Sequence, residues 1–380
     1  MNIALINSNA TDISESSKKG TDIFSHILYQ ELHKSFLNGN SFTSYASKTS
    51  DLPFPIIGVT DTATVNNPTI PADKRIVFEL ALLGKAFSDQ NNYDLFHMNI
   101  GDGDIALPFC NFVHKPILIT LHNTHRFSYR TELFNLYKDC KNVFFVSISN
   151  AQRNFFPGLQ YAATIYNGIE LSKFEFNKIG GESMIWVGRA IPEKGMDIAL
   201  KVSKMLNHDI NLFALTKDDS KEWYENLKNE CETIYLKASI REDEPRSNLI
   251  HEYQNSKVFV FPILWEEPFG LVITESMSCG TPVVAYANGS MPEIIEDGKT
   301  GFLVNESESK KTGDWIIKKT GFEGLCEAVE RVYTLPTSEY EQMRLQCRKR
   351  VEKYFTSEKM AQEYNKVYTE IIKAEKKLQD

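Results

Sequence analysis

The sequence predicts an α/β protein with two domains, each built on a parallel sheet. Apolar strand-like runs alternate with helix-periodic stretches along most of the 380 residues, which is typical of strands joined by crossover helices. The alternation restarts near residue 183 after a polar stretch, and the chain is too long for one ordinary core. We therefore expect a first domain over 1–170, a linker at Ser172–Glu182 and a second domain over 183–356.

The first domain is expected to begin with a buried strand, Asn2–Ile6, and a helix over Asp22–Leu37 with apolar residues at helical spacing. The further strands expected there are Asp94–Met98, Pro116–Leu121, Val143–Ile148 and Ala163–Tyr166. The tail from Ser357 to Gln379 has one apolar stripe and is expected to pack as a terminal helix. The stripe consists of Met360, Tyr364, Val367, Tyr368 and Ile371.

The second domain repeats the alternation of strands and helices. The expected strands are Met184–Val187, Ile210–Leu215, Val258–Phe261, Pro282–Tyr286 and Thr300–Val304. The expected helices are Gly195–Met205, Leu249–Asn255 and Gly270–Ser278. The segment Lys217–Asn248 is highly charged, so we expect a surface helix and a solvated loop, with an acceptor-contacting flap as the alternative.

The composition argues against several classes of protein. A net charge of −8 and a pI near 5.6 disfavour a general nucleic-acid binder, which needs a basic face for phosphates. The first residues turn polar too soon for a signal peptide, and no apolar run approaches the roughly 20 residues that span a bilayer. A peripheral membrane contact stays open, because it needs only a surface patch.

The cysteines are scattered and contain no Cys-x-x-Cys pair. We therefore expect reduced, mostly buried thiols in a cytoplasmic protein, and no zinc site. The six cysteines are Cys110, Cys140, Cys231, Cys279, Cys326 and Cys347.

A strand-to-helix connection in the second half carries candidate binding groups. The strand ends at Phe261, an acidic loop follows, and a helix begins near Gly270. The first turn of such a helix has unpaired N–H groups and the positive end of the dipole, which favour an anion. Phe269, Gly270 and Leu271 carry no bulky polar side chain that would block a phosphate there.

Two glutamates accompany this connection, Glu267 in the loop and Glu275 in the helix. A carboxylate accepts two hydrogen bonds well, so it suits a vicinal diol such as a ribose or a sugar ring. Taken alone, Glu275 would be read as a solvated helix residue, and the surrounding pattern is what favours binding.

A second cluster, Trp186–Gly195, also follows a strand and opens a helix, at the edge where open α/β folds bind ligands. Arg189 and Lys194 can place two positive charges beside one pyrophosphate, Lys194 as a point charge and Arg189 as a planar fork. Either residue alone would be read as a surface cation, and the glycines beside the turn make the pair more specific.

Together these motifs resemble the retaining glycosyltransferases of family 4, the glycosyl transferases group 1 domain. In the second half the resemblance rests on Gly188-Arg189, Glu193-Lys194-Gly195, the two glutamates with seven residues between them, and Gly280–Ala285. In the first half it rests on Asp94–His97, Thr120–Asn123, Ser147–Asn150 and Tyr166–Ile169.

The resemblance implies a GT-B fold, in which two Rossmann-like domains with parallel sheets face a central cleft. The first domain, with 357–380 as a helix crossing back to it, would take the acceptor, and 183–356 would take a nucleotide-sugar donor. The resemblance assigns the donor diphosphate to Arg189 and Lys194, the ribose hydroxyls to Glu275, the donor sugar to Glu267 and His122, and backbone or loop contacts to Phe269, Gly270, Leu271 and Gly20.

Three features fit the pattern less directly. The glycine loop of the family often has two adjacent glycines, whereas this chain has Lys18-Lys19-Gly20, and the lysine pair is usually just solvated. His97 is read as structural, although a binding role is left open. Asp102-Gly103-Asp104 resembles a metal-binding Asp-x-Asp, but a Gly-flanked acidic pair is most often a turn, so we expect no essential metal.

The implied function is a hexosyltransferase that retains the anomeric configuration and moves a sugar from a nucleoside diphosphate to a glycan, lipid or small-molecule acceptor. No cofactor is expected, since the nucleotide sugar is a substrate. Two alternatives use the same fold: a nucleotide-sugar epimerase, and a non-catalytic protein that binds sugar nucleotides. A glycan phosphorylase is disfavoured, because the sequence offers no lysine context for pyridoxal phosphate.

Overall fold

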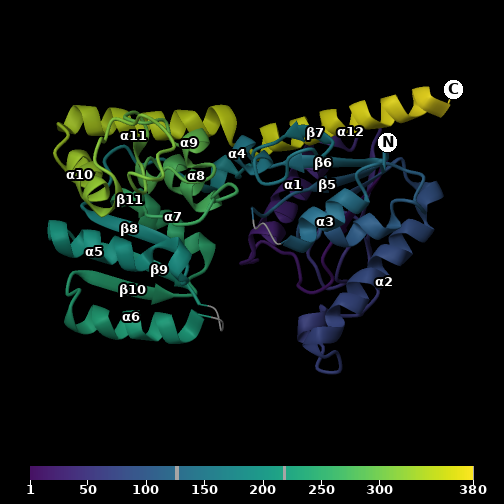
Figure 1. The fold of residues 1–380 in the computed structure, drawn as a ribbon, viewed down its shortest axis with the longest axis horizontal. Helices are drawn as coiled ribbons and strands as arrows, with labels where there is room; N and C mark the ends of the chain where they lie inside the picture. The colour runs from purple at the N-terminus through teal and green to yellow at the C-terminus, as the bar shows by residue number, and fades with distance from the viewer. Residues whose placement is uncertain (125–127, 217–219, 380) are drawn as a thin grey trace. The chain divides into compact units, whose positions relative to one another are not determined.

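The structure, a computed structural model, describes residues 1–124, 128–216 and 220–379 and divides the chain into two compact units (Figure 1). Unit 1 comprises Met1–Gly168 together with Ser357–Asp380, and unit 2 comprises Ile169–Thr356. Each unit is an α/β structure on a parallel sheet, so the predicted fold class is confirmed.

Over the described residues of unit 1, a seven-stranded sheet has the order β3-β2-β1-β4-β5-β6-β7, and all its neighbouring strands are parallel. The strands are β1 Asn2–Asn7, β2 Ser41–Tyr45, β3 Ile56–Ile57, β4 Leu95–Asn99, β5 Ile117–Thr120, β6 Val143–Ser147 and β7 Tyr161–Thr164. The helices are α1 Gly20–Phe36, α2 Arg75–Ser88, α3 Ser128–Leu136, α4 Asn150–Arg153 and α12 Ser357–Gln379.

In the described part of unit 2, a six-stranded parallel sheet has the order β10-β9-β8-β11-β12-β13. Its strands are β8 Ser183–Arg189, β9 Ile210–Leu215, β10 Ala238–Glu242, β11 Ser256–Phe261, β12 Val283–Tyr286 and β13 Gly301–Val304. The helices are α5 Met196–Leu206, α6 Lys221–Thr233, α7 Arg246–Gln254, α8 Leu271–Ser278, α9 Met291–Ile294, α10 Gly321–Tyr333 and α11 Thr337–Tyr354.

The strand order of both units reverses once, as in a doubly wound sheet. In unit 1 the chain runs outward from β1 to β3 and then returns to β4 on the other side of β1. In unit 2 it runs from β8 to β10 and returns to β11 beside β8. Ligands of such sheets bind beyond the carboxyl ends of the two strands at the reversal. The order therefore directs attention to the ends of β1 and β4 and of β8 and β11.

The terminal helix α12 is part of unit 1, where it packs against α1 (Figure 1). Its apolar stripe is buried in the core that the first strands form with α1, and Tyr364 and Tyr368 are fully enclosed. The hydroxyl of Tyr364 lies 3.0 Å from Thr120 Oγ1, and that of Tyr368 lies 2.8 Å from His97 Nδ1. Burial lowers the pKa of His97 to about 3, so this histidine is a neutral member of the core.

The stretch Ser172–Glu182, expected as a linker, is attached to unit 2. The backbone N–H of Asn177 donates to Cys279 O at 3.1 Å, and its side-chain amide donates to Gln254 O at 3.1 Å. These bonds hold the stretch against the ends of α7 and α8.

The first three residues of the charged segment Lys217–Asn248 lie outside the described residues. The rest contains the expected helix, α6, and exposed loop residues such as Leu236, Lys237 and Asp243, together with a strand that was not expected. This strand, β10, is an edge strand paired with β9 from Ala238↔Ile210 to Glu242↔Ala214. The strand leaves Ser239, Arg241 and Glu242 exposed. Charged residues are common on edge strands because they discourage pairing with another chain. The same charge hides the strand from a search for apolar alternation.

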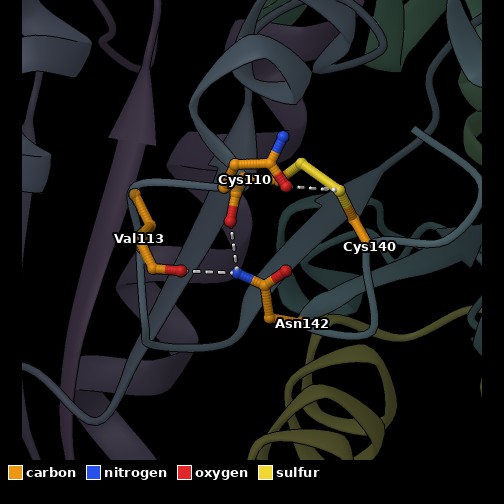
Figure 2. The surroundings of a disulfide bond; sticks show 5 residues. Cys110, Val113, Cys140 and Asn142 are labelled. Carbon is orange, nitrogen blue, oxygen red and sulfur yellow. Dashed lines mark hydrogen bonds between the residues drawn. A yellow bond between two sulfur atoms is a disulfide. The ribbon is translucent and has the colours of Figure 1, made fainter. Parts of the chain in front are cut away.

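The expectation of reduced cysteines is wrong for one pair, because Cys110 and Cys140 form a disulfide (Figure 2). They are 30 residues apart, but each precedes one of the paired strands β5 and β6, so both lie in connections that enter the same sheet edge. Asn142 joins the same connections by donating to Cys110 O at 3.1 Å and Val113 O at 2.7 Å. Free thiols remain at Cys231, Cys279, Cys326 and Cys347.

We expect Cys140→Ser to lower the unfolding free energy of unit 1 by about 3–4 kcal/mol, because a bond that closes a loop of this length restricts the unfolded chain. Urea unfolding followed by hydrogen exchange in β5 and β6 measures the effect. A reductant should lower the unfolding free energy of the wild type to that of Cys140→Ser. Cys326→Ser is the control and should unfold like the wild type, with and without reductant. Identical unfolding of wild type and Cys140→Ser without reductant would contradict the pairing.

Among the helices of the described residues, none combines the length and apolar character needed to cross a membrane.

Candidate functional site

The candidate site of unit 2 lies where the strand order reverses. Arg189 is the last residue of β8, and the 3₁₀ turn Pro192–Lys194 follows it. The loop after β11 carries Trp265 and Glu267 and leads to α8. The two sequence motifs therefore follow adjacent parallel strands and meet at the carboxyl edge of the sheet, as the predicted position required.

Lys194 is held inside this edge by its glycine neighbour. Gly195 has a φ of +68°, and a Cβ there would lie 2.1 Å from Pro262 O. Only glycine therefore allows the turn after β8 to pack this closely on the end of β11. The carbonyl of Lys194 accepts the indole N–H of the fully buried Trp186 at 3.1 Å, which fixes the turn to the core.

The Lys194 ammonium forms an ion pair with Glu267, and both residues are buried, at 8% and 7% exposure. Burial and the nearby Arg189 lower the pKa of Lys194, while the Glu267 carboxylate acts in the opposite direction. A cation and an anion that neutralise each other in a closed site can exchange partners when a ligand brings its own charges. The pair is thus suited to a ligand that carries both phosphate and hydroxyl groups.

The two predicted cations converge on one aromatic ring. Arg189 Cζ lies 5.2 Å from the centroid of the Trp265 ring, and Lys194 Nζ lies 4.7 Å from it. Both distances are within the range of cation–π attraction. The indole N–H of Trp265 donates to Glu267 Oε2 at 2.6 Å, so this tryptophan contacts the carboxylate and both cations.

The start of α8 adjoins the same carboxylate. Gly270 precedes the helix with a φ of +91°, and a Cβ built on it would lie 3.5 Å from Glu267 Cγ. Leu271 is the first helical residue, and the ring of Phe269 packs against Phe355 at a centroid distance of 5.7 Å. N–H groups in a first helical turn have no intrahelical acceptor, so the positive helix end lies beside the Lys194–Glu267 pair.

Glu275 lies further along α8 and has its own partners. It is 2% exposed, its Oε1 accepts from Arg246 Nε at 2.7 Å, and its Oε2 accepts from the hydroxyl of Tyr253 at 3.3 Å. It is therefore no solvated helix residue. Arg246 Nη2 also lies 2.7 Å from Oε1, so the acceptor capacity that remains for a hydroxyl is on Oε2.

In unit 1, His122 follows β5, and its Nε2 lies 3.2 Å from Asn99 Oδ1 at the end of β4. Its backbone N–H donates to Asp102 Oδ1 at 2.8 Å, and its ring packs edge-on against Phe24 at 4.8 Å. Burial and the charge of Lys19 lower the pKa of His122 to about 3, so the imidazole is neutral near pH 7. It can then both donate and accept a hydrogen bond.

The acidic pair around Gly103 forms a turn, with Gly103 N–H donating to Ile100 O at 2.7 Å. Asp102 is fully buried and pairs with Arg130, whose Nε lies 3.4 Å from an oxygen of Asp104. An arginine thus occupies the position between the two carboxylates. Within the ranges that the structure describes, no three His, Cys, Asp or Glu side chains are grouped as for a metal ion.

Gly20 is the first residue of α1 and has open space where a Cβ would stand. The geometry of this turn therefore does not demand glycine for packing. Its expected approach to a donor stays a prediction, as does the contact of His122 with a sugar.

Comparisons with known proteins agree with this geometry. Residues 169–319 match the family model described as glycosyl transferases group 1. The matched stretch covers less than half of the chain. It contains β8 to β13 and therefore the whole candidate site of unit 2.

Curated relatives match parts of the chain. An uncharacterized 41.2 kDa protein from the cps region of Klebsiella pneumoniae is 30% identical over 39% of this chain and 42% of its own length. An uncharacterized glycosyltransferase of Methanocaldococcus jannaschii is 25% identical over 66% of this chain and 78% of its own. The D-inositol 3-phosphate glycosyltransferase of Thermobifida fusca is 28% identical over 38% of each chain. The chain spans less than half the length of most curated relatives that it matches.

Solved structures match over nearly the whole chain. Sucrose-phosphate synthase from Thermosynechococcus elongatus has a TM-score of 0.74 at 19% identity and covers 98% of this chain and 99% of its own. The Anabaena protein HepE in complex with UDP and glucose has a TM-score of 0.71 at 15% identity, covering 97% and 99%. The chain shares the GT-B fold with these solved structures.

The sequence-based argument missed the groups that hold Glu275. Arg246 opens α7, and its guanidinium also lies 5.4 Å from the Phe174 ring centroid. Tyr253 lies on the same helix. Both come from a segment more than twenty residues before Glu275, so only the packing of α7 on α8 brings them to the carboxylate.

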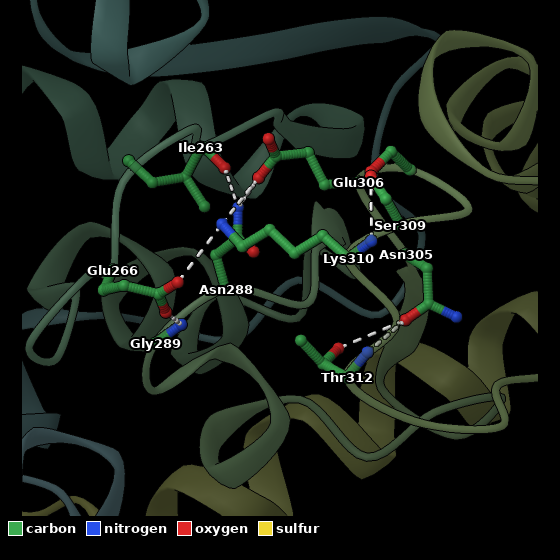
Figure 3. Close-up of polar contacts among 10 residues, drawn as sticks. Ile263, Glu266, Asn288, Gly289, Asn305, Glu306, Ser309, Lys310 and Thr312 are labelled. Atoms are coloured by element: carbon green, nitrogen blue, oxygen red, sulfur yellow. Dashed lines mark hydrogen bonds and ion pairs between the residues drawn. The ribbon is translucent and has the colours of Figure 1, made fainter. Parts of the chain in front are cut away.

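Unit 2 contains a further polar cluster that the sequence did not predict (Figure 3). Glu266, next to Glu267, accepts the backbone N–H of Gly289 at 2.6 Å and pairs with Lys310 at 3.1 Å. Lys310 also pairs with Glu306 at 2.9 Å, and Glu306 accepts from Asn288 at 2.5 Å. These contacts attach the loop after β11 to the connections after β12 and β13. They therefore help to fix the loop that carries Trp265 and Glu267.

Proposed function

We propose that this protein is a retaining hexosyltransferase that takes a sugar from a nucleoside-diphosphate donor. The observation that supports it most is the convergence of Arg189, Lys194, Glu267 and the α8 start at the strand reversal of unit 2. Such a place binds anions in open α/β sheets. The HepE structures contain UDP, UDP-glucose or UDP with glucose, which agrees with a nucleotide-sugar donor.

The proposed donor contacts follow the chemistry of each group. Arg189, Lys194 and the α8 N–H groups would bind the diphosphate, because all three carry positive charge or donors. Glu267 would bind hydroxyls of the sugar, and Glu275 the ribose hydroxyls, because carboxylates accept from diols. These positive groups supply charge for the leaving diphosphate, so no step is assigned to a metal.

In the proposed reaction, the bond between the anomeric carbon and the diphosphate oxygen breaks, and its electron pair stays on the diphosphate. The acceptor hydroxyl oxygen forms the new bond to the anomeric carbon from the same face. Its proton passes to the departing phosphate oxygen, which balances the step. Preorganised donors beside the developing charge are each worth roughly 3–4 kcal/mol.

The acceptor is proposed only by class: a glycan, a lipid or a small hydroxylated molecule. The D-inositol 3-phosphate glycosyltransferases among the relatives illustrate the last class. A cytoplasmic or membrane-peripheral location accompanies this proposal.

The first test is a thermal-shift screen of the purified chain against a panel of nucleoside diphosphates and nucleotide sugars. One nucleotide sugar and the nucleoside diphosphate with the same base should raise the melting temperature of the protein, because a ligand that binds the folded state stabilises it by mass action. Release of nucleoside diphosphate from that donor should then be measured with and without acceptors, and the anomeric configuration of the product by NMR.

The outcomes separate the competing functions. Transfer with retained configuration supports the proposal, whereas an inverted linkage contradicts its mechanism. Conversion of the free nucleotide sugar without any acceptor indicates an epimerase. Binding without turnover under any acceptor indicates a non-catalytic protein, and a panel without a single stabilising nucleotide would overturn the donor site.

A further inference from the structure

The carboxylate of Glu267 is held asymmetrically. Lys194 Nζ and Trp265 Nε1 both contact the same oxygen, Oε2, the indole at 2.6 Å. A carboxylate oxygen has two lone pairs, so these two donors fill Oε2. The other oxygen, Oε1, carries no contact of this kind in the described part of the chain. The arrangement leaves one oxygen of the acid to serve a ligand.

The Trp265 ring is itself fixed by charge. Its face lies 4.7 Å from Lys194 Nζ and 5.2 Å from Arg189 Cζ. The ring therefore lies against both cations, while its N–H points to the acid. An aromatic ring has a negative face and a positive edge, so it can satisfy cations and an anion in one orientation.

Without the indole N–H, the local geometry has another solution. A lysine ammonium has three protons and can contact both oxygens of one carboxylate. The short stem of Glu267 and the buried site would then favour a closed pair in which Lys194 covers Oε1 as well. The indole N–H takes one lone pair of Oε2 and the ammonium the other, so the two donors together hold the carboxylate in one orientation.

We propose that Trp265 is a positioning residue for the donor sugar: it holds Glu267 so that Oε1 faces the sugar hydroxyls, and so makes donor binding depend on their configuration. This inference rests on the proposed function, because it concerns the same donor site. It assigns Trp265 no contact with the reacting atoms.

The test is Trp265→Phe, which keeps a smaller aromatic ring for the cations and removes the N–H donor. Calorimetry should compare UDP with UDP-glucose, and GDP with GDP-mannose, for wild type and variant. The variant should keep its affinity for the bare diphosphate within about threefold. The extra affinity that the sugar gives should fall roughly tenfold or more, as expected for a lost hydrogen bond to a charged group.

Two comparisons make this result specific. Glu267→Gln should lose the same sugar contribution, and the double variant should lose little more, because both changes remove one interaction. Trp315→Phe is the matched control, since Trp315 also donates its N–H to a side-chain oxygen, Asn305 Oδ1 at 3.2 Å. It should leave both affinities unchanged.

Three outcomes would contradict the proposal, and they differ in what they overturn. A Trp265→Phe protein with an intact sugar contribution overturns the positioning role and leaves the donor site standing. Equal loss for diphosphate and nucleotide sugar makes Trp265 merely structural and also overturns the proposal. A wild type that binds neither nucleotide pair overturns the proposed function and this inference with it.

Discussion

Lys194→Ala is expected to lower sugar transfer by about 10²–10³-fold, because the variant loses a preorganised charge beside the leaving diphosphate. The ammonium is buried, where it pairs with Glu267 and lies 4.7 Å from the centroid of the Trp265 ring. Water cannot replace it there as it would on a surface. The measurement is steady-state turnover of the donor identified in the nucleotide panel, with the product diphosphate quantified.

The control for this prediction is a lysine of similar charge and different surroundings. Lys201 on α5 pairs with Asp197 at 2.8 Å, and its side chain is about half exposed. Lys201→Ala should transfer at the wild-type rate, because an exposed pair contributes little. Near-wild-type turnover of Lys194→Ala in a folded sample would remove the basis of the donor-site assignment.

Stability must be followed in the same samples. The substitution leaves the buried Glu267 without its cation, although the Trp265 N–H still donates to it. A buried anion that loses its partner destabilises the fold. Lys194→Ala with Glu267→Gln removes that charge, so a double variant that regains stability assigns the destabilisation to the unpaired carboxylate.

The sequence predicted the fold class because a parallel sheet requires apolar strands and crossover helices in alternation. It could not predict the strand order, since pairing between β8 and β11 depends on contacts across more than sixty residues. Strands β2 and β10 were missed for a local reason. Both are short and contain several polar residues, so neither forms a continuous apolar run.

The candidate site, like the fold, was predictable only in part. The cluster around Arg189 and Lys194 and the start of α8 were predictable because each follows a strand, and parallel strands end at one edge. The partners of these residues were not. Whether Lys194 pairs with Glu267, or Arg246 with Glu275, depends on rotamers and helix packing, which no local spacing encodes.

Arg344→Met is expected to lower the unfolding free energy of unit 2 by about 4–5 kcal/mol or more, because it leaves several buried carbonyls without a donor. Arg344 lies on α11 and is fully buried. Its guanidinium donates to Asn177 O at 2.8 Å, Ser256 O at 3.0 Å, Gln254 O at 2.9 Å and Cys279 O at 3.3 Å.

Two of these carbonyls explain how this cation is tolerated in the core. Gln254 is the last residue of α7, and Cys279 follows α8, so both carbonyls belong to helix C-termini. Such ends have unpaired carbonyls and the negative end of the dipole, which together favour a cation. Arg344 thus joins the ends of the helices that carry Arg246 and Glu275.

Thermal unfolding should show a melting temperature lower by about 10 °C or more for Arg344→Met. Lys349→Ala, which removes an exposed cation on the same helix, should leave the melting temperature unchanged.

Arg344→Lys keeps the charge with fewer donors. It should therefore fold, with a melting temperature between those of Arg344→Met and the wild type. Because α7 and α8 would then be joined less firmly, the Lys variant should also bind nucleoside diphosphate more weakly, through the loosened Arg246–Glu275 pair. A Lys variant with lowered stability and unchanged nucleotide affinity would show that Arg344 supports only the core.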